Sequence, residues 1–312
     1  MKIIILLILL LLIPFGLFAD IFDESSKLLQ NGQYSETLNK LAQLKPNLKK
    51  NEIYLYHYYK GKAYFQLNNY RSAVADLKEV IKLKPNWAFP YNDLGLAYSY
   101  LNDQKQAEIY LLKAIKLNKT FTLAYYHLGN IYLKLKEYDN ALKNYKFSLK
   151  LEKEDDLISK IYLGMGNAYQ AQKKISNSIE SFKRSIDKDE KNWKAHMNLS
   201  LVYFNEDMYD ESIDSLEEVV RINEKYYKAY FYLGNCYRAE KKYDKMEHYY
   251  KLSLKYKSDD TDTLYSLASY YALKEKKDLM MKTLKKLFSV DEKYKNIIMD
   301  DKLFRKYQND IK

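Results

Sequence analysis

The sequence contains few of the residues that interrupt helices. Only eight glycines and four prolines occur in 312 residues. A β-sandwich or β-barrel needs many tight turns, and so few glycines and prolines leave little room for them. Aliphatic and aromatic residues nevertheless make up 47% of the chain, so it can bury a continuous core. The composition therefore favours a protein built from helices.

Cysteine and histidine are scarce too. Cys236 is the only cysteine and cannot form a disulfide within the chain, so the fold depends on side-chain packing. We expect Cys236 to be buried as a small hydrophobic residue; a disulfide to a second chain is the alternative. The histidines are dispersed, with no second His or Cys at metal-ligand spacing: His57, His127, His196 and His248. We therefore predict a protein without a metal site, a cofactor or enzymatic activity.

A regularly spaced tyrosine is the most prominent feature of the chain. It recurs every 34 residues, with one interval of 37, at Tyr64, Tyr98, Tyr132, Tyr169, Tyr203, Tyr237 and Tyr271. A small residue precedes each tyrosine by three places, namely Gly61, Gly95, Gly129, Gly166, Ser200, Gly234 and Ala268. A period in this range is typical of a solenoid, in which each unit packs mainly against its neighbours.

Each repeated unit has the pattern of two helices. In one unit, the apolar face of the first helix is Tyr91, Leu94, Gly95 and Tyr98, at i, i+3, i+4 and i+7. The matching face of the second helix is Ala107, Leu111, Ala114 and Ile115. Asn102 and Asp103 lie between them and have the chemistry of a turn. We expect the small residues Gly95 and Ala107 to let the paired helices approach closely.

This pattern resembles the tetratricopeptide repeat family. The resemblance rests on the string Tyr91-x2-Leu94-Gly95-x2-Tyr98, on the second-helix residues that follow it, and on Pro85 at the end of a unit. It covers seven full units in about residues 53–292. The resemblance implies an all-α, right-handed superhelical solenoid of antiparallel helix pairs. It also implies a protein that binds other proteins along the concave surface formed by the first helices.

The remaining parts of the chain divide into three segments. We expect residues 1–19 to be a signal peptide, 20–52 to be an atypical repeat with a truncated first helix, and 293–312 to form a capping helix, since terminal units need a polar outer face. The one longer interval falls across residues 151–156, where we expect three extra residues to lengthen the connection between two units. A hinge between two sub-arrays is the alternative.

The N-terminus has the layout of a secretory signal peptide. Lys2 is followed by an aliphatic run over residues 3–13, Pro14 and Gly16 end the run, and Ala19 offers a small residue for cleavage. The apolar stretch of about 16 residues is shorter than the ~20 of a full membrane span. An uncleaved anchor in the inner membrane and a plain first helix are the alternatives. We therefore predict an exported protein at the periplasmic or extracellular face.

The net charge of +11 favours acidic partners, such as acidic proteins or anionic lipid headgroups. A basic, tyrosine-rich chain could also bind nucleic acid by stacking. We do not expect nucleic acid, because the apolar N-terminus predicts export and because many tyrosines fall on the repeat framework, where they pack.

Two groups of residues are candidates for a ligand groove. In three successive units one face of the first helix presents Lys160, Lys194 and Lys228, and Arg238 extends the last column. The amides of Asn130, Asn167 and Asn235 fall in one row and could donate to and accept from an extended backbone. These residues predict a groove for an acidic or extended polypeptide. An ordinary solvated lysine face is the alternative.

The N-terminal half has a different character on the corresponding face. Its residues are Leu55-Tyr58-Lys62, Phe89-Asn92-Leu96 and Leu123-Tyr126-Asn130. Tyr58, Phe89 and Tyr126 make this an apolar and aromatic groove suited to anchoring side chains. Packing of the same residues against neighbouring helices is the alternative.

The sequence thus predicts a non-catalytic interaction scaffold of a bacterial-type cell envelope. One alternative is a self-associating or membrane-tethered assembly factor. Another is an accessory subunit of an enzyme carried on a separate chain.

Overall fold

The computed structural model describes residues 16–44 and 51–311, and this part of the chain is helical throughout, without a strand. Most of the predicted signal peptide, residues 1–15, lies outside the described residues. Among the helices of the described part, none combines the length and the apolar character needed to cross a membrane. The prediction of an all-α fold is confirmed.

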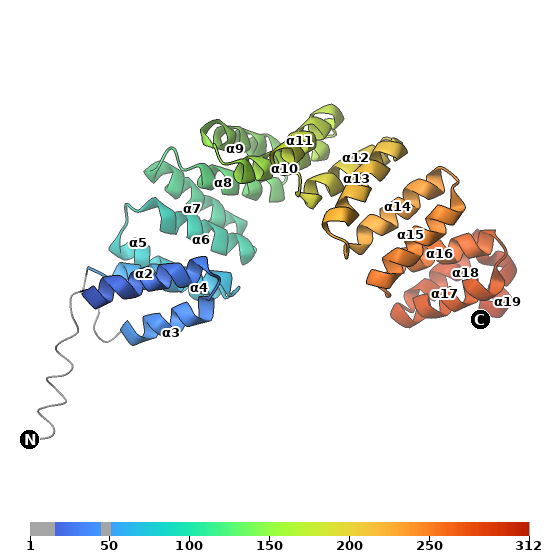
Figure 1. Cartoon of the computed structure of the whole chain (residues 1–312), viewed down its shortest axis with the longest axis horizontal. Helices are drawn as coiled ribbons and strands as arrows, with labels where there is room; N and C mark the ends of the chain where they lie inside the picture. Colours follow the sequence, from blue (N-terminus) through green and yellow to red (C-terminus); the bar gives the residue numbers. More distant parts are fainter. Residues whose placement is uncertain (1–15, 45–50, 312) are drawn as a thin grey trace, which may run out of the picture. The chain divides into compact units, whose positions relative to one another are not determined.

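Seven antiparallel helix pairs form the repeat array, as predicted (Figure 1). The first helices are α4 (Ile53–Gln66), α6 (Ala88–Tyr100), α8 (Thr122–Lys134), α10 (Asp155–Ala171), α12 (Trp193–Asn205), α14 (Tyr227–Ala239) and α16 (Thr261–Leu273). The second helices are α5 (Tyr70–Leu83), α7 (Gln104–Leu117), α9 (Tyr138–Leu151), α11 (Ile175–Lys188), α13 (Tyr209–Ile222), α15 (Tyr243–Tyr256) and α17 (Lys277–Val290). The chain divides into two compact units, one ending at Lys153 and the other beginning at Glu154.

The longer interval between repeats lies in a helix and not in a connection, so our prediction of a lengthened connection was wrong. Helix α10 has 17 residues, whereas α8 and α12 have 13 each. Only residues 152–154 link α9 to α10, while residues 118–121 link α7 to α8. The added residues include Asp155 and Asp156 in the first turn of α10. Carboxylates are stabilised at a helix N-terminus by the macrodipole, so these residues continue the helix backward.

The small-residue row makes room for large side chains of the second helix. A Cβ atom added at Gly95 would lie 2.6 Å from Cγ of Leu111 and 3.1 Å from the carbonyl oxygen of Ala107. The close approach of the paired helices that we predicted at Gly95 and Ala107 is therefore confirmed. The same arrangement recurs between Gly61 and Leu77, Gly129 and Tyr145, Gly166 and Phe182, and Gly234 and Tyr250. In these five pairs the glycine therefore sets how closely the two helices approach.

The tyrosine row marks the C-terminal ends of the first helices. In every pair the backbone carbonyl of the tyrosine accepts a hydrogen bond from the amide five residues later, as in Asp103 N to Tyr98 O at 2.9 Å. The residue before that amide has a left-handed backbone, and its φ lies between 56° and 63° in Asn68, Asn102, Lys136, Lys173, Asp207, Lys241 and Glu275. This six-to-one bond with a left-handed residue is the Schellman ending of a helix. The backbone turn therefore repeats even where the side chain changes.

The N-terminal repeat is more complete than we predicted. Helix α2 (Gly16–Gln30) has 15 residues and pairs with α3 (Tyr34–Leu44), so the expectation of a truncated first helix was wrong. Phe22 of α2 is buried against Leu41 of α3 and Tyr56 of α4. Since α2 begins at Gly16, it includes the last residues of the predicted signal segment. Cleavage of that segment stays a prediction.

The C-terminal end, where we expected a capping helix or two, is covered by three short elements. These are α18 (Lys293–Asp300), the 3₁₀ helix η2 (Lys302–Tyr307) and α19 (Gln308–Ile311). Four apolar side chains of these elements are buried in one cluster with the last helix pair, namely Ile298, Phe304, Tyr307 and Ile311. The Tyr265 hydroxyl of α16 donates to Asp301 at 2.6 Å. The cap thereby closes the apolar face that the last repeat would otherwise expose.

Candidate functional site

The cysteine is placed as predicted. Cys236 is fully buried, and its thiol donates to the Ser212 hydroxyl at 3.4 Å. Burial raises the pKa of this thiol to about 11, so it is protonated at neutral pH. Within the described ranges, no three His, Cys, Asp or Glu side chains are gathered as a metal site would require. His57 and His127 instead pair singly, with Asp76 at 2.7 Å and with Asn92 at 2.8 Å.

The three lysines of the predicted groove are exposed, Lys160 on the second turn of α10 and Lys194 and Lys228 on the first turns of α12 and α14. Lys160 forms an ion pair at 2.6 Å with Asp156, one turn earlier on α10. The Lys194 ammonium lies 5.7 Å from the ring centre of its neighbour Trp193. Lys228 is exposed on α14. These positions leave the row accessible to solvent, and a role in ligand binding stays a prediction.

Arg238 lies at the other end of α14, beside a cavity. It lines a space of about 250 Å³ together with Tyr243, Ser269 and Leu303. The Ser269 hydroxyl oxygen is buried without a hydrogen-bond partner. Arg238 therefore belongs to a different local environment from the three lysines, which lie near the starts of their helices.

The asparagine row has partners within the fold. The side-chain oxygen of Asn130 accepts from the Tyr145 hydroxyl at 2.6 Å, and that of Asn235 accepts from the Tyr250 hydroxyl at 2.6 Å. In both cases the tyrosine follows the asparagine by 15 residues, a spacing that is visible in the sequence. Phe182 takes the tyrosine position after Asn167, which accepts instead from the Asn198 amide at 2.7 Å. The row thus links helices, and its oxygens already have donors.

The three aromatic residues predicted for the N-terminal groove differ in exposure. Phe89 is 48% exposed, although its ring centre lies 4.9 Å from that of Phe121. Tyr58 is partly buried, with its ring centre 4.4 Å from that of Trp87. Tyr126 is partly buried beside Tyr145. Only Phe89 of the three therefore offers a largely open apolar surface.

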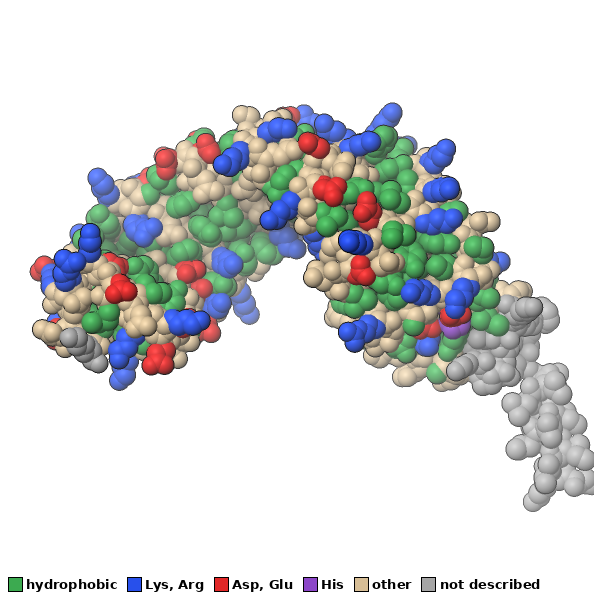
Figure 2. Space-filling model, turned by 180° about the vertical axis from the view of Figure 1, so that it is seen from behind, with side chains coloured by type: hydrophobic (Ala, Val, Ile, Leu, Met, Phe, Trp, Pro, Cys, Tyr) green, Lys and Arg blue, Asp and Glu red, His purple; other side chains and the backbone are tan. Residues whose placement is uncertain are grey.

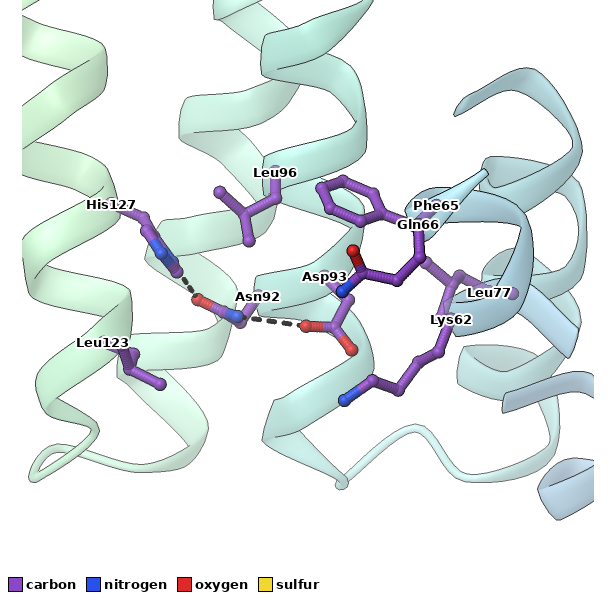
Figure 3. Close-up of a pocket in the computed structure, with 10 residues that line it drawn as sticks. Lys62, Phe65, Gln66, Leu77, Asn92, Asp93, Leu96, Leu123 and His127 are labelled. Carbon is purple, nitrogen blue, oxygen red and sulfur yellow. Dashed lines mark hydrogen bonds between the residues drawn. The ribbon is translucent and has the colours of Figure 1, made fainter. Parts of the chain in front are cut away.

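A cavity of about 200 Å³ lies on this same face, between three successive first helices (Figure 3). Helix α4 contributes Gly61, Lys62, Phe65 and Gln66, helix α6 contributes Asn92, Asp93 and Leu96, helix α8 contributes Leu123 and His127, and Leu77 completes the lining. A second space, of about 370 Å³, lies between α2 and α4 and shares Lys62 and Gln66 with the first. The two spaces together run across four first helices.

The polar groups of the first cavity form a short chain of hydrogen bonds. Asn92 is the central residue, since its oxygen accepts from Nδ1 of His127 at 2.8 Å and its Nδ2 donates to Oδ1 of Asp93 at 3.1 Å (Figure 3). The other carboxyl oxygen, Oδ2 of Asp93, is buried without a hydrogen-bond partner. Asn92 is itself 4% exposed. The chain therefore ends in an acceptor that has no donor.

Burial shifts the pKa values of the groups in this cavity. It raises the pKa of Asp93, and the positive charge of Lys62 opposes that shift. Burial lowers the pKa of His127 to about 4, so the ring is neutral at physiological pH. Burial raises the pKa of Tyr58, and the charge of Asp93 and a hydrogen-bonding contact with that carboxyl group raise it further. Asp93 is thus a carboxyl group whose charged form is disfavoured by burial and favoured by the neighbouring Lys62.

Our sequence reasoning named the face of this cavity but missed Asp93 and His127. One signal in the sequence pointed to Asp93: it is the only charged residue of α6, whose sequence is AFPYNDLGLAYSY. Figure 2 shows one face of the molecule, on which Lys and Arg side chains are spread among hydrophobic and acidic ones and not collected in a single patch. The net charge of the chain therefore does not indicate this site, whereas the isolated carboxylate of Asp93 does.

Comparison with known proteins agrees with the helix-pair pattern. Models of the tetratricopeptide repeat match residues 61–101, 90–121, 122–155, 163–226 and 227–260. The chain therefore contains tetratricopeptide repeats. No curated protein sequence matches it.

Solved structures of other repeat proteins share the fold. PilF of Pseudomonas aeruginosa is 15% identical with a TM-score of 0.60, and the match covers 70% of this chain and 99% of that one. The Cut9–Hcn1 assembly of APC/C is 15% identical with a TM-score of 0.58, covering 93% of this chain and 55% of that one. YrrB, described as a TPR protein with an unusual peptide-binding site, is 19% identical with a TM-score of 0.50, and the match covers 61% of this chain and 96% of YrrB. At these identities the likeness concerns the fold.

Proposed function

We propose that this protein is a non-catalytic scaffold that binds an extended polypeptide on the first-helix face of its N-terminal unit. The observation that carries the proposal is the cavity between α4, α6 and α8, which combines apolar walls with a buried carboxyl oxygen that has no donor. Small, mostly apolar spaces with a few oriented polar groups are typical of ligand sites. The neighbouring space between α2 and α4 favours an extended ligand over a compact one.

The exposed apolar residues around the cavity support the same proposal. Leu123 lines the cavity and is 41% exposed, and Phe89 of α6 is 48% exposed. Apolar side chains that remain open to water beside a concave site are characteristic of surfaces that bind partners. The description of YrrB as peptide-binding is an analogy in the same direction.

The state of the reactive side chains supports a non-catalytic role. The Cys236 thiol has a pKa raised to about 11, whereas an activated nucleophile has a lowered one. The Nδ1 of His127 already bonds to Asn92, and the pKa of this histidine lies near 4. Neither group is poised as a nucleophile or base at neutral pH. An accessory role beside an enzyme on another chain is the alternative.

The C-terminal unit supplies a second candidate surface for an acidic segment of a ligand. Lys160, Lys194 and Lys228 are exposed at equivalent positions of three successive first helices. Their charges would add along an acidic strand that crosses these helices. Self-association through either surface is the structural alternative, and analytical ultracentrifugation over a range of concentrations distinguishes it.

We further propose that the protein is exported to the cell envelope. The support is the aliphatic run over residues 3–13, followed by small residues and then by the repeats. Cell fractionation with N-terminal sequencing tests this directly. We expect the protein outside the cytoplasm, with the apolar segment either removed or holding it in the inner membrane. Full-length protein that is free in the cytoplasm would contradict export.

A peptide display library selected against the full chain in mild detergent tests the binding proposal. Leu123→Asn adds a polar group to the cavity wall, and Ile109→Asn makes the same type of change on the outer helix α7, where Ile109 is 56% exposed. We expect Leu123→Asn to weaken the selected peptides about five-fold or more, through lost apolar contact, and Ile109→Asn to leave their affinity unchanged. Equal affinities for both variants and the wild type would place binding elsewhere.

A further inference from the structure

We propose that the cavity between α4, α6 and α8 is an arginine pocket, in which Asp93 receives the guanidinium group of a bound polypeptide and Phe65, Leu96 and Leu123 hold its aliphatic stem. This inference rests on the proposed function, because it specifies which side chain of the ligand enters the cavity. It concerns the chemistry of the ligand and not its identity.

The unfilled hydrogen-bonding capacity of the cavity belongs to an acceptor. Oδ2 of Asp93 is buried without a hydrogen-bond partner, while Oδ1 accepts from the Asn92 amide, and the Tyr58 hydroxyl also interacts with this carboxyl group. A buried acceptor without a partner is unfavourable, so a ligand that brings N–H groups gains by reaching it. Asn92 has both ends of its amide in use, and His127 uses its Nδ1–H on Asn92. Within the chain, the Tyr58 hydroxyl and Lys62 both interact with this carboxyl group, yet Oδ2 itself has no hydrogen-bond partner, so a ligand can supply that donor.

Lys62 lies near Asp93 but forms no ion pair with it among the described residues. Its ammonium group lies 5.6 Å from the ring centre of Tyr58, which is a cation–π arrangement. Within the described part of the chain, Asp93 makes no ion pair, although Lys62 is near enough to influence its ionisation. Figure 3 shows the carboxyl group of Asp93 between Asn92 on one side and Lys62 with Gln66 on the other. Lys62 thus flanks the pocket and leaves Oδ2 open.

The shape and lining of the cavity favour arginine over lysine. A guanidinium is planar, carries five donors and stacks on aromatic rings, whereas an ammonium is compact and strongly hydrated. Phe65 provides the ring, and Leu96 lies beside it (Figure 3). Space of about 200 Å³ holds one long side chain and not a folded segment. An arginine would place its stem on these apolar walls and its head against Asp93.

Two variants with opposite effects test the sign of the charge that the pocket receives. Asp93→Asn removes the acceptor charge at nearly constant shape, and Lys62→Gln removes the positive charge that repels a cation. For an arginine ligand we expect Asp93→Asn to weaken binding about ten-fold or more and Lys62→Gln to strengthen it a few-fold. A carboxylate ligand would show the reverse pattern, and that result would overturn the proposal.

The probes are peptides selected from a random display library on the full chain, each measured beside its Arg→Gln counterpart. We expect one arginine position to be enriched, and we expect the Arg→Gln change to weaken binding to the wild type but not to Asp93→Asn. Selected peptides that lack arginine, or that respond to neither variant, would overturn the arginine pocket and leave the scaffold proposal standing. No enriched peptide at all would contradict both. If Asp93→Asn loses its helical circular dichroism, the Lys62→Gln comparison carries the test alone.

Discussion

A Cβ atom added at Gly129 would lie 2.6 Å from Cε1 of Tyr145. Tyr145 is fully buried, and its hydroxyl donates to Asn130. The ring is therefore held by packing against Gly129 and by a hydrogen bond at its hydroxyl. The contact joins α8 to α9 within one repeat. It shows that a glycine on the first helix and a ring on the second are one packing unit, repeated along the chain with other large residues in place of the tyrosine.

Replacing Gly129 by leucine should therefore separate two helices that now touch. We expect a loss of about 1–3 kcal/mol of unfolding free energy from overpacking. Lys143→Leu on α9 is the control, because Lys143 is exposed and the change also adds a leucine. Urea denaturation followed by circular dichroism measures both. An unchanged midpoint for Gly129→Leu would show that Tyr145 can move aside at no cost.

Replacing Gly32 by leucine should act through the backbone and not through a clash. Gly32 has a φ of 77°, and its nearest side-chain neighbour, the Tyr34 hydroxyl, would lie 3.8 Å from an added Cβ. A leucine in this left-handed conformation costs about 1–2 kcal/mol, whereas asparagine tolerates it better. We expect Gly32→Asn to be more stable than Gly32→Leu in thermal denaturation. Equal penalties for the two variants would point to packing instead.

The three exposed lysines of the C-terminal unit should attract acidic ligands. We expect the variant with Lys160, Lys194 and Lys228 changed to glutamate to bind a glutamate-rich peptide much more weakly than the wild type does. We also expect the wild-type affinity to fall as the salt concentration rises, because exposed charges are screened over about 8–10 Å. The control changes Lys183, Lys282 and Lys285, exposed on α11 and α17, which alters the net charge equally. Calorimetric titration at two salt concentrations measures all three proteins. Equal losses in both triple variants would reveal a net-charge effect and no groove.

Acid should destabilise the protein through His127. The pKa of this histidine is about 4 in the fold against an ordinary 6.5. Between these values the unfolded chain takes up a proton that the folded chain does not, so the unfolding free energy falls as the pH falls, by up to about 3 kcal/mol. The raised pKa of Asp93 contributes with the opposite sign, because protonation there favours the folded state.

The variant His127→Gln separates these two contributions. It removes the imidazole and retains Asp93 and Lys62, so the difference from the wild type reports the histidine alone. We expect the wild type to lose more unfolding free energy than the variant between pH 7.0 and 4.5, as measured by urea denaturation. Parallel pH profiles would mean that the ring reaches solvent when protonated.

Much of the fold could be predicted from local patterns. The spacing of Tyr98 and Gly95 and its echoes indicated helix pairs, because the side chains of one helical face recur at i, i+3, i+4 and i+7 whatever the rest of the chain does. The turn at Asn102 was predicted from its residue type and has a φ of 63°. The insertion at 151–156 was misjudged, because Asp155 and Asp156 suit a helix N-terminus as well as a loop.

The candidate site was predictable only in outline. The repeat, the helix pairs and the face that carries Lys62, Leu96 and Leu123 could be predicted, because they follow from spacing within one helix. Packing between helices was needed to show that Asn92 connects His127 of the next repeat to Asp93, and that one oxygen of Asp93 has no hydrogen-bond partner. Burial and hydrogen bonding of a side chain depend on its neighbours from other helices, and no periodicity within a single helix records those neighbours.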